Sequence, residues 1–191
     1  MIDSATAVIL AGGKSSRMGR DKALLPYRGK NLIDAPIAIL SAIFSNVILS
    51  VREPDHYSAY VLPKIADHYP DIGPMGGILS VLESGYQRIF CVACDMPYLN
   101  ERLITHLCSY ENYDAVIPTW NGRAESLHAL YTGSLIPSFE EAVKSKRYKL
   151  TDVLASANVR YVRNEEIQRF DSEGFSFKNV NTPPDYEKLE D

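Results

Sequence analysis

Short β-branched runs alternate with helix-length amphipathic stretches along most of the chain, and this alternation limits the possible folds more than any other feature. Strands separated by helical segments pair in parallel through crossover connections, so the pattern predicts βαβ units, a Rossmann-like, mainly parallel sheet and a three-layer α/β/α sandwich. In such sheets, ligands lie at the carboxyl ends of the strands. We therefore expect functional residues in the loops that follow the strands.

The predicted elements come in a regular order. Strands are expected at 6–11, 46–51, 64–66, 89–94, 114–118, 126–131, 158–163 and 175–179. Helices are expected at 31–44, 76–84, 100–110, 134–146, from Thr151, and at 183–189. Ser134 is expected to cap its helix, and Asn181-Thr182 to open the last one.

The size and composition favour one compact unit. The chain has 191 residues, of which 46% are hydrophobic and 23% charged, so a single domain spanning residues 1–191 is expected. No apolar run approaches the length of a membrane span, and no secretory signal is visible, which predicts a cytoplasmic protein without membrane contact.

The three cysteines do not suggest a disulfide scaffold, because their number is odd. Cys91 and Cys94 form a C-x-x-C pair, which can bind zinc or take part in redox chemistry. The pair falls within a predicted buried strand, however, where residues three apart point to opposite faces. We expect ordinary core cysteines rather than a metal-thiolate site.

Charge is distributed unevenly along the chain. The net charge of −4 gives no general basis for nucleic-acid binding. Between Gly12 and Lys30, however, six basic residues accompany the single acid Asp21, while the rest of the chain carries a net −9. This cationic segment predicts an anion site, although a charged segment of this kind can also be solvated surface.

The cationic segment begins with a glycine-rich loop directly after the first predicted strand. Gly12 and Gly13 allow close backbone approach and positive φ, so that N–H groups can converge on a phosphate. Arg17 offers a planar fork for phosphate oxygens, and Lys22 offers a point charge. The spacing fits neither a Walker A loop nor a G-x-G-x-x-G dinucleotide fingerprint.

A carboxylate follows the most apolar predicted strand. Asp95, in Cys94-Asp-Met-Pro97, should emerge at the same sheet edge as the glycine-rich loop. A carboxylate there suits Mg²⁺, which shares its coordination between one or two carboxylates and substrate phosphates. The alternative is an Asp that caps the following helix.

The segment from Leu10 to Lys22 resembles the signature L-A-G-G-x-x-x-R-M-G-x-D-K of the molybdenum cofactor guanylyltransferases, the MobA-type members of the nucleotidyltransferase superfamily. The resemblance implies the nucleotide-diphospho-sugar transferase type of fold. It also implies that the backbone of 10–13 faces the nucleotide, with Gly12-Gly13 favouring guanine. Arg17 and Lys22 would hold the triphosphate, and Asp95, in a motif similar to the family's metal motif, would bind Mg²⁺.

Two further segments look like family motifs with departures. The segment 73–78 is similar to G-P-L-x-G-I, with Met75 replacing Leu, and it follows Asp67. The resemblance implies that Asp67 contacts the nucleotide. Ser50 stands where the family often has an Asn that contacts the guanosine, so Ser50 is also a nucleotide-binding candidate.

The carboxyl-terminal half resembles the family at two more places. The segment 125–131 is similar to E-P-L-x-A-x-Y, with Ser126 in place of Pro. Its His128 is either a general base or, more in keeping with an alternating strand, a packed structural histidine. The segment 177–183 is similar to the closing F-x-N-x-N-T-P, which makes Asn179 and Asn181 candidates for acceptor binding on one strand face. Asn181 can also serve as a helix cap.

A second basic cluster lies between Lys144 and Lys149. It can meet the phosphate of the second substrate, or it can simply place cations at a helix end.

The resemblance implies transfer of GMP from GTP to molybdopterin-bound molybdenum cofactor, with release of pyrophosphate. Arg17, Lys22 and Asp95 are the expected catalytic residues, Mg²⁺ the expected cofactor, and cofactor-insertion proteins and molybdoenzymes the expected partners. Two alternatives stay open: a related enzyme that uses CTP or another phosphorylated acceptor, and a non-catalytic nucleotide-binding adaptor that delivers the cofactor.

Overall fold

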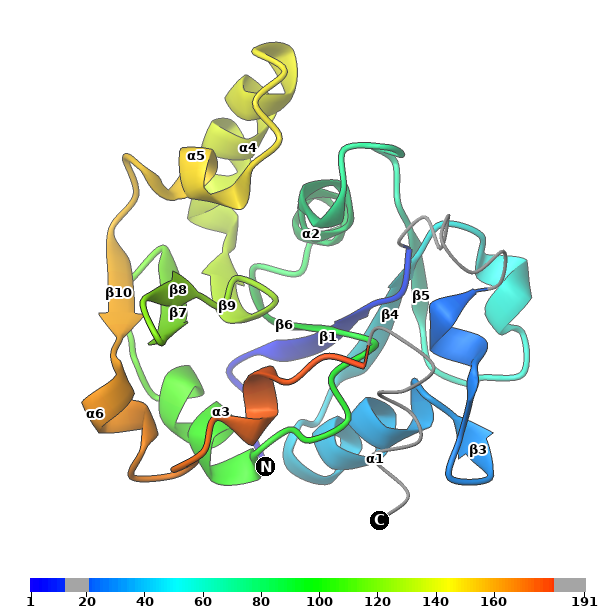
Figure 1. Ribbon diagram of the computed structural model, residues 1–191. Coiled ribbons are helices and arrows are strands. Elements are labelled where there is room, and N and C mark those ends of the chain that lie inside the picture. Colours follow the sequence, from blue (N-terminus) through cyan, green and yellow to red (C-terminus); the bar gives the residue numbers. More distant parts are fainter. Residues whose placement is uncertain (13–20, 181–191) are drawn as a thin grey trace.

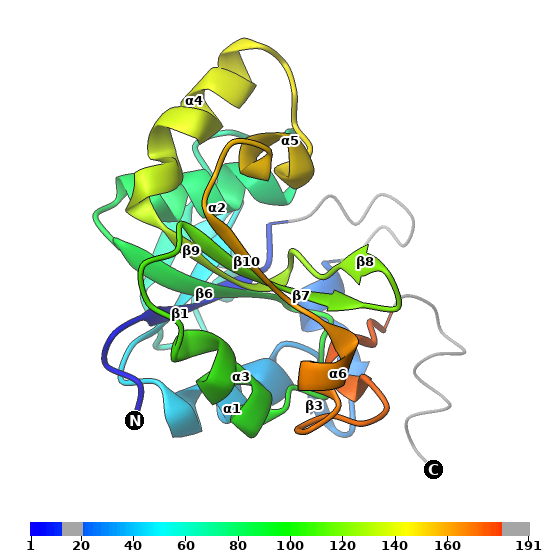
Figure 2. The same cartoon turned by 90° about the vertical axis from the view of Figure 1, so that its left-hand side faces the viewer.

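The computed structural model describes residues 1–12 and 21–180, and it has the predicted three-layer α/β/α architecture (Figures 1 and 2). The strands are β1 (Thr6–Leu10), β2 (Pro26–Tyr27), β3 (Lys30–Asn31), β4 (Val47–Val51), β5 (Lys64–Ala66), β6 (Arg88–Ala93), β7 (Ala115–Trp120), β8 (Arg123–Ala124), β9 (His128–Thr132) and β10 (Val159–Val162). The helices are α1 (Asp34–Ile43), α2 (Pro74–Glu83), α3 (Glu101–Cys108), α4 (Ile136–Lys144), α5 (Leu150–Leu154) and α6 (Asn164–Ile167). Short 3-10 helices are η1 (Lys22–Leu24), η2 (Pro54–Tyr57), η3 (Gly133–Leu135) and η4 (Phe175–Phe177).

The main sheet has the strand order β10-β7-β9-β6-β1-β4-β5, with β8 paired to the end of β7. β1 lies parallel to both β4 and β6, with Ile9 opposite Leu49 on one side and opposite Val92 on the other. β9 runs antiparallel between β6 and β7. The sheet is therefore mainly parallel, as predicted, and β1, β4, β5 and β6 all end at the same edge.

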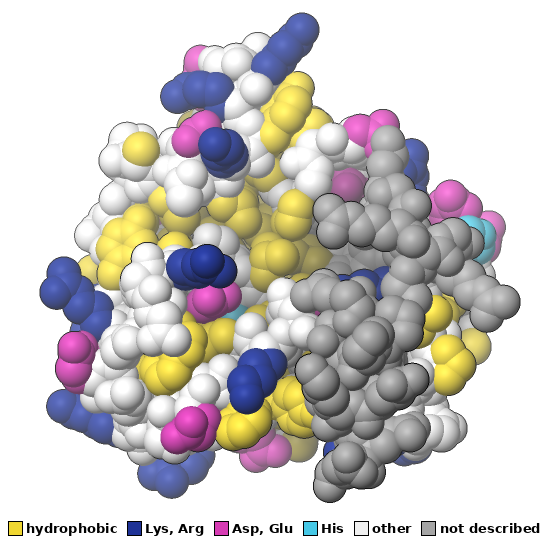
Figure 3. All heavy atoms as spheres, viewed as in Figure 1, with side chains coloured by type: hydrophobic (Ala, Val, Ile, Leu, Met, Phe, Trp, Pro, Cys, Tyr) yellow, Lys and Arg dark blue, Asp and Glu magenta, His cyan; other side chains and the backbone are white. Residues whose placement is uncertain are grey.

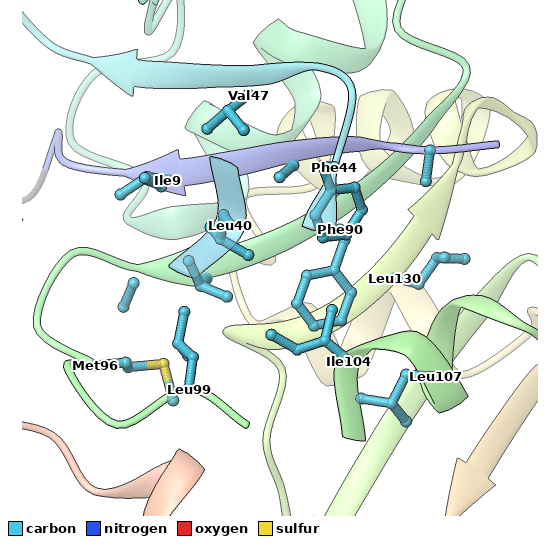
Figure 4. Close-up of a cluster of buried hydrophobic side chains, with 14 of the residues drawn as sticks. Ile9, Leu40, Phe44, Val47, Phe90, Met96, Leu99, Ile104, Leu107 and Leu130 are labelled. Carbon is cyan, nitrogen blue, oxygen red and sulfur yellow. The ribbon is translucent and has the colours of Figure 1, made fainter. Parts of the chain in front are cut away.

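Alternating side chains of the central strands fill two cores, one on each face of the sheet. Ile9 and Phe90 face α1 and α3 in the cluster drawn in Figure 4, while Val8 and Cys91 face α2 and α4. Burial on both faces removes apolar area worth about 1.5–3 kcal/mol for each large side chain. It also explains why β1 and β6 read as continuous apolar runs.

The cysteines lie as the sequence predicts. Cys91 belongs to the core beneath α2, whereas Cys94 packs against the core on the opposite face, and both are free thiols. No cluster of three or more metal-ligating side chains occurs in residues 1–12 and 21–180.

Some predicted boundaries are wrong. The first long helix begins at Asp34 rather than residue 31, because residues 26–31 form the β2–β3 hairpin and Asp34 Oδ2 accepts the Asn31 N–H at 2.8 Å. Ser134 does not cap α4, which starts two residues later; its hydroxyl donates to Asp114 Oδ1 at 2.5 Å instead.

The predicted strand at 175–179 is also wrong. Phe175–Phe177 is a 3-10 turn, because the buried carboxylate of Asp171 accepts the backbone N–H groups of Phe175 and Ser176 at 3.0 and 2.8 Å. Those N–H groups are thereby taken from any sheet ladder. The predicted helix at 183–189 lies outside the described residues.

Within the described ranges, the structure has no helix that is long and apolar enough to cross a membrane.

Candidate active site

The carboxyl ends of four neighbouring parallel strands form one edge of the sheet. The loop after β1 carries Gly12, the residue after β5 is Asp67, and Asp95 follows β6 by two residues. β9, being antiparallel, begins at this same edge with His128 opposite Val92. The fold thus gathers at one edge most of the candidate residues that the structure describes, as the strand-end rule predicts.

Lys22 and Asp95 are in direct contact at this edge. Lys22 Nζ lies 2.5 Å from Asp95 Oδ2, although the two residues are 73 positions apart in sequence. Their side chains are 23% and 13% exposed, so the pair is neither fully desolvated nor freely hydrated. Lys22, one of the cations of the segment, and the predicted metal ligand therefore lie together, as the predicted nucleotide site requires.

Asp95 keeps one carboxylate oxygen unused. Its residue is 9% exposed, and Oδ1 is buried without a hydrogen-bond partner in the described part of the chain. A buried carboxylate oxygen without a donor is costly unless something else satisfies it. A hard divalent cation such as Mg²⁺ is a suitable partner, so the donor set fits the predicted ion. Asp95 does not act as the cap of the next helix; that role belongs to Asn100.

A buried tyrosine that sequence reasoning missed ties together the two ends of the glycine-rich loop. Tyr57 OH donates to Ala11 O at 3.1 Å and to Asp21 Oδ2 at 2.7 Å. Asp21 in turn accepts the Ala23 N–H and so caps η1, the turn that presents Lys22. Burial, reinforced by Asp21, raises the pKa of Tyr57, so its hydroxyl stays protonated and remains a donor. No sequence motif marks this residue.

Gly12 is favoured at its position by a close backbone contact rather than by its backbone angle. A Cβ on Gly12 would lie 3.3 Å from the backbone N of Arg52 at the end of β4, and its φ is not positive. The backbone of Gly12 therefore lies close to the end of β4 without a positive φ, and its approach to a phosphate stays a prediction. Leu10 and Ala11 belong to the same strand end, where Ala11 N donates to Ser50 O at 2.8 Å. Gly13 and Arg17 lie outside the described residues.

The start of α2 packs tightly against Asp67 and Ser50. A Cβ on Gly76 would lie 2.5 Å from Tyr69 O and 2.8 Å from Asp67 Oδ1, and a Cβ on Gly77 would lie 2.7 Å from Ser50 Oγ. These glycines let α2 approach the ends of β4 and β5. Asp67 Oδ1 accepts the Tyr69 N–H at 2.8 Å, which fixes the carboxylate beside the helix start. Ser50 is only 2% exposed.

His128 is a packed core residue. Its ring lies between Phe90 and Phe177, with both ring centroids at 5.3 Å and near-perpendicular planes. The side chain is fully buried, neither ring nitrogen has a partner among the described residues, and burial lowers the pKa of His128 to about 3. The structural interpretation of His128 fits this geometry, and a proton-accepting role does not.

The carboxyl-terminal residues reach the Asp95 loop. Val180 N donates to Asp95 O at 3.0 Å, which places exposed Asn179 on the segment that passes beside Asp95. Asn179 reaches this place from an extended segment after η4 and not from a strand face. Asn181, the other acceptor candidate, lies outside the described residues.

The second basic cluster stands at the end of α4, where Lys144 lies in the last turn. A cation at this position interacts favourably with the helix dipole.

In the space-filling view of Figure 3, hydrophobic side chains gather at the centre of the face and charged ones lie mainly around it.

Comparison with known proteins gives a consistent result. Residues 7–164 match the family described as MobA-like NTP transferase domain. A protein named probable molybdenum cofactor guanylyltransferase from Carboxydothermus hydrogenoformans is 35% identical over 187 residues, covering 96% of this chain and 94% of that protein. One of the same name from Methanosarcina mazei is 34% identical over 201 residues, covering 96% and 89%.

Solved structures agree with this assignment. The molybdopterin-guanine dinucleotide biosynthesis protein A from Archaeoglobus fulgidus superposes with a TM-score of 0.84 at 28% identity, covering 97% of this chain and 96% of that one. A 4-diphosphocytidyl-2C-methyl-D-erythritol synthase from Anaerococcus prevotii, at 12% identity and a TM-score of 0.70, shares the fold. With a family match over most of its length, relatives above 30% identity and the sheet-edge site in place, the chain belongs to the MobA-like NTP transferases.

Proposed function

We propose that the protein transfers GMP from GTP to molybdopterin-bound molybdenum cofactor and releases pyrophosphate. The observation that carries the proposal is the meeting of Lys22 Nζ and Asp95 Oδ2 at 2.5 Å, at the edge where β1 and β6 end. This places a cation beside a carboxylate whose second oxygen is buried without a partner among the described residues, and both groups suit the charge neutralisation that phosphoryl transfer needs. The names of the relatives and of the A. fulgidus structure support the choice of guanine and molybdopterin.

The reaction needs positioning and charge neutralisation more than proton transfer. A phosphate oxygen of the acceptor forms a bond to the α-phosphorus of GTP, and the bond from that phosphorus to the bridging oxygen of pyrophosphate breaks, its electron pair leaving with pyrophosphate. The attacking phosphate is already an anion, so no general base is required. This agrees with the burial of His128, whose lowered pKa keeps it neutral but whose ring is closed off from the site.

Each site residue has a role in the proposed reaction that follows from its position. Lys22 reaches the site from the turn that Asp21 caps, and its ammonium can move from Asp95 to the α-phosphate as charge develops there. Arg17 neutralises the β- and γ-phosphates. The 10–13 backbone, Ser50 and Asp67 hold the nucleoside, and Asn179 and Asn181 contact the acceptor. Asp95 holds Mg²⁺, which when bound supplies Lewis-acid stabilisation of phosphate charge.

The cellular setting is part of the same proposal. The three free cysteines agree with a reducing compartment, so we place the protein in the cytoplasm, where it hands its product to cofactor-insertion proteins and molybdoenzymes.

Incubation with each of the four nucleoside triphosphates, Mg²⁺ and molybdopterin cofactor, with products resolved by mass, tests the proposal. Of the four nucleoside triphosphates, we expect only GTP to yield pyrophosphate and a dinucleotide product, which contains guanine. Turnover of CTP without GTP would assign the protein to a cytidylyl-transferring relative. Tight GTP binding without any product would support a delivery adaptor instead.

A further inference from the structure

A segment far along the chain anchors the loop that carries Asp95. Residues 170–180, which we call the carboxyl-terminal strap, pass beside α3 and reach the end of β6 (Figure 1). The strap contains η4 and ends at Val180, whose N–H donates to the Asp95 carbonyl at 3.0 Å. No other hydrogen bond to the Asp95 carbonyl is found among the described residues.

The loop is held from both sides of Asp95. On the amino-terminal side, Cys94 N donates to Leu10 O at 3.2 Å and so continues the pairing of β6 with β1. On the carboxyl-terminal side, the bond from Val180 restrains the peptide that follows the Asp95 Cα. The direction of a side chain depends on the peptides that flank its Cα. Because Val180 holds one of the two peptides that flank the Asp95 Cα, the strap shares control of where the carboxylate points.

Asn100 links the strap to the body of the protein. Its Nδ2 donates to Phe170 O at 2.9 Å, and its backbone N–H donates to Ser176 Oγ at 3.0 Å. Ser176 is fully buried, and Asp171 holds its N–H from within the strap. The strap is therefore tied to Asn100 at one end and to Asp95 at the other.

Asn100 has a second, separable task. Its Oδ1 accepts the Leu103 N–H at 3.0 Å and caps α3. A serine can cap a helix equally well but cannot reach the Phe170 carbonyl with an N–H donor. The substitution Asn100→Ser thus keeps the cap and removes the side-chain bond to the strap.

We propose that Asn100 is a positioning residue for nucleotidyl transfer: by holding the strap, it fixes the Asp95 carbonyl and with it the aim of the metal-binding carboxylate. The inference rests on the proposed function and deepens it. Residues that orient a ligand from outside the coordination shell typically change metal affinity by about 10- to 100-fold when they are replaced.

The test measures Mn²⁺ binding to the full chain saturated with a non-hydrolysable GTP analogue, by electron paramagnetic resonance. We expect Asn100→Ser to bind Mn²⁺ about tenfold more weakly than wild type and to need correspondingly more Mg²⁺ for half-maximal turnover, while the KM for GTP at saturating Mg²⁺ changes little.

The matched control is Asn158→Ser. Asn158 directly precedes β10, and its Nδ2 also donates to a backbone carbonyl at 2.9 Å, that of Asn112. This substitution should leave Mn²⁺ affinity unchanged. If Asn100→Ser does not fold, as judged by thermal unfolding, Ser176→Ala replaces it, because it removes the other link between Asn100 and the strap.

The outcomes separate the two proposals. The positioning role is overturned if the folded Asn100→Ser variant binds Mn²⁺ as tightly as wild type, or if Asn158→Ser loses as much Mn²⁺ affinity as Asn100→Ser. In either case, GTP turnover by the wild type still supports the proposed function. Weakened Mn²⁺ binding in Asn100→Ser alone supports the positioning role, even if the wild type makes no guanine dinucleotide and the proposed function fails.

Discussion

Replacing Lys22 by methionine should change metal binding and turnover in opposite directions. The ammonium of Lys22 lies 2.5 Å from the carboxylate oxygen of Asp95, so any cation that binds this carboxylate must displace or tolerate a positive charge. Methionine keeps most of the side-chain length and removes the charge. We therefore expect Lys22→Met to bind a divalent cation more tightly in the absence of nucleotide, and to catalyse more slowly in its presence.

The exposures of the two side chains, taken with general magnitudes, set the expected size of both effects. Two unit charges about 4 Å apart near a protein surface interact with about 4 kcal/mol. The side chains are 23% and 13% exposed, and after discounting for solvent screening we take about 1.4–2.8 kcal/mol. This corresponds to a roughly 10- to 100-fold gain in cation affinity. Loss of one preorganised donor to transition-state charge slows turnover by about 100- to 1,000-fold.

Mn²⁺ titration of the nucleotide-free protein, followed by electron paramagnetic resonance, measures the first effect, and pyrophosphate release measures the second. The control is Lys64→Met, because Lys64 Nζ donates only to the carbonyls of Tyr60 and Leu62 in the described structure, at 2.6 and 3.1 Å. Mn²⁺ affinity in Lys22→Met equal to or below that of wild type would refute the competition between Lys22 and the cation.

Other changes give equally direct tests. Asp95→Asn keeps the shape of the carboxylate but removes its charge, and should lower turnover at moderate Mg²⁺ by at least about 100-fold; unchanged pyrophosphate release would remove Asp95 from the site. Burial lowers the pKa of His128 from its ordinary value of 6.5 to about 3 in the folded protein. As pH falls below 6.5, the unfolded chain therefore binds a proton at His128 that the folded protein does not bind. The free energy of unfolding should thus be highest above about pH 6.5 and should decrease as pH falls toward 3. Denaturant unfolding should show wild type losing about 2 kcal/mol more than His128→Leu between pH 7 and pH 5, and parallel curves would argue against the buried neutral ring. Gly76→Ala forces a Cβ to within 2.5 Å of Tyr69 O, and should cost about 1–3 kcal/mol in the same assay; a cost near zero would show that α2 can shift without penalty. Tyr57→Phe removes a donor from two acceptors, one of them charged, and should lower stability by about 1.5–3 kcal/mol and weaken GTP binding measured by calorimetry, whereas wild-type GTP affinity would show that the loop keeps its shape without the hydroxyl.

The sequence predicts the sheet and the placement of Lys22 and Asp95 at its edge, because both depend on strong local patterns. β1 and β6 are apolar on both faces, as expected of strands in a sheet that helices cover on both sides, and the ends of parallel neighbours then meet at one edge. That Lys22 and Asp95 lie at the same edge follows from this geometry together with the motif spacing, whereas their direct contact was not predicted.

What could not be predicted depends on contacts between segments without a local signature. The alternation in 175–179 fits a strand, but Asp171 captures two of its N–H groups and curls it into a 3-10 turn. Tyr57 stands in a stretch without periodicity, and its two acceptors belong to residues more than thirty positions away. Tertiary hydrogen bonds of this kind override local propensity.

The bond between Val180 and Asp95 also bears on how the molecule comes into being. Every strand of the main sheet that the structure describes has been synthesised once residue 162 has left the ribosome, whereas Val180, the donor for the Asp95 carbonyl, is made later. Chains emerge from their amino terminus, so the scaffold can assemble cotranslationally while the loop bearing its key carboxylate still awaits its restraint. We therefore expect a nascent chain halted after β10 to lack the restraint on the Asp95 carbonyl even where its sheet has formed.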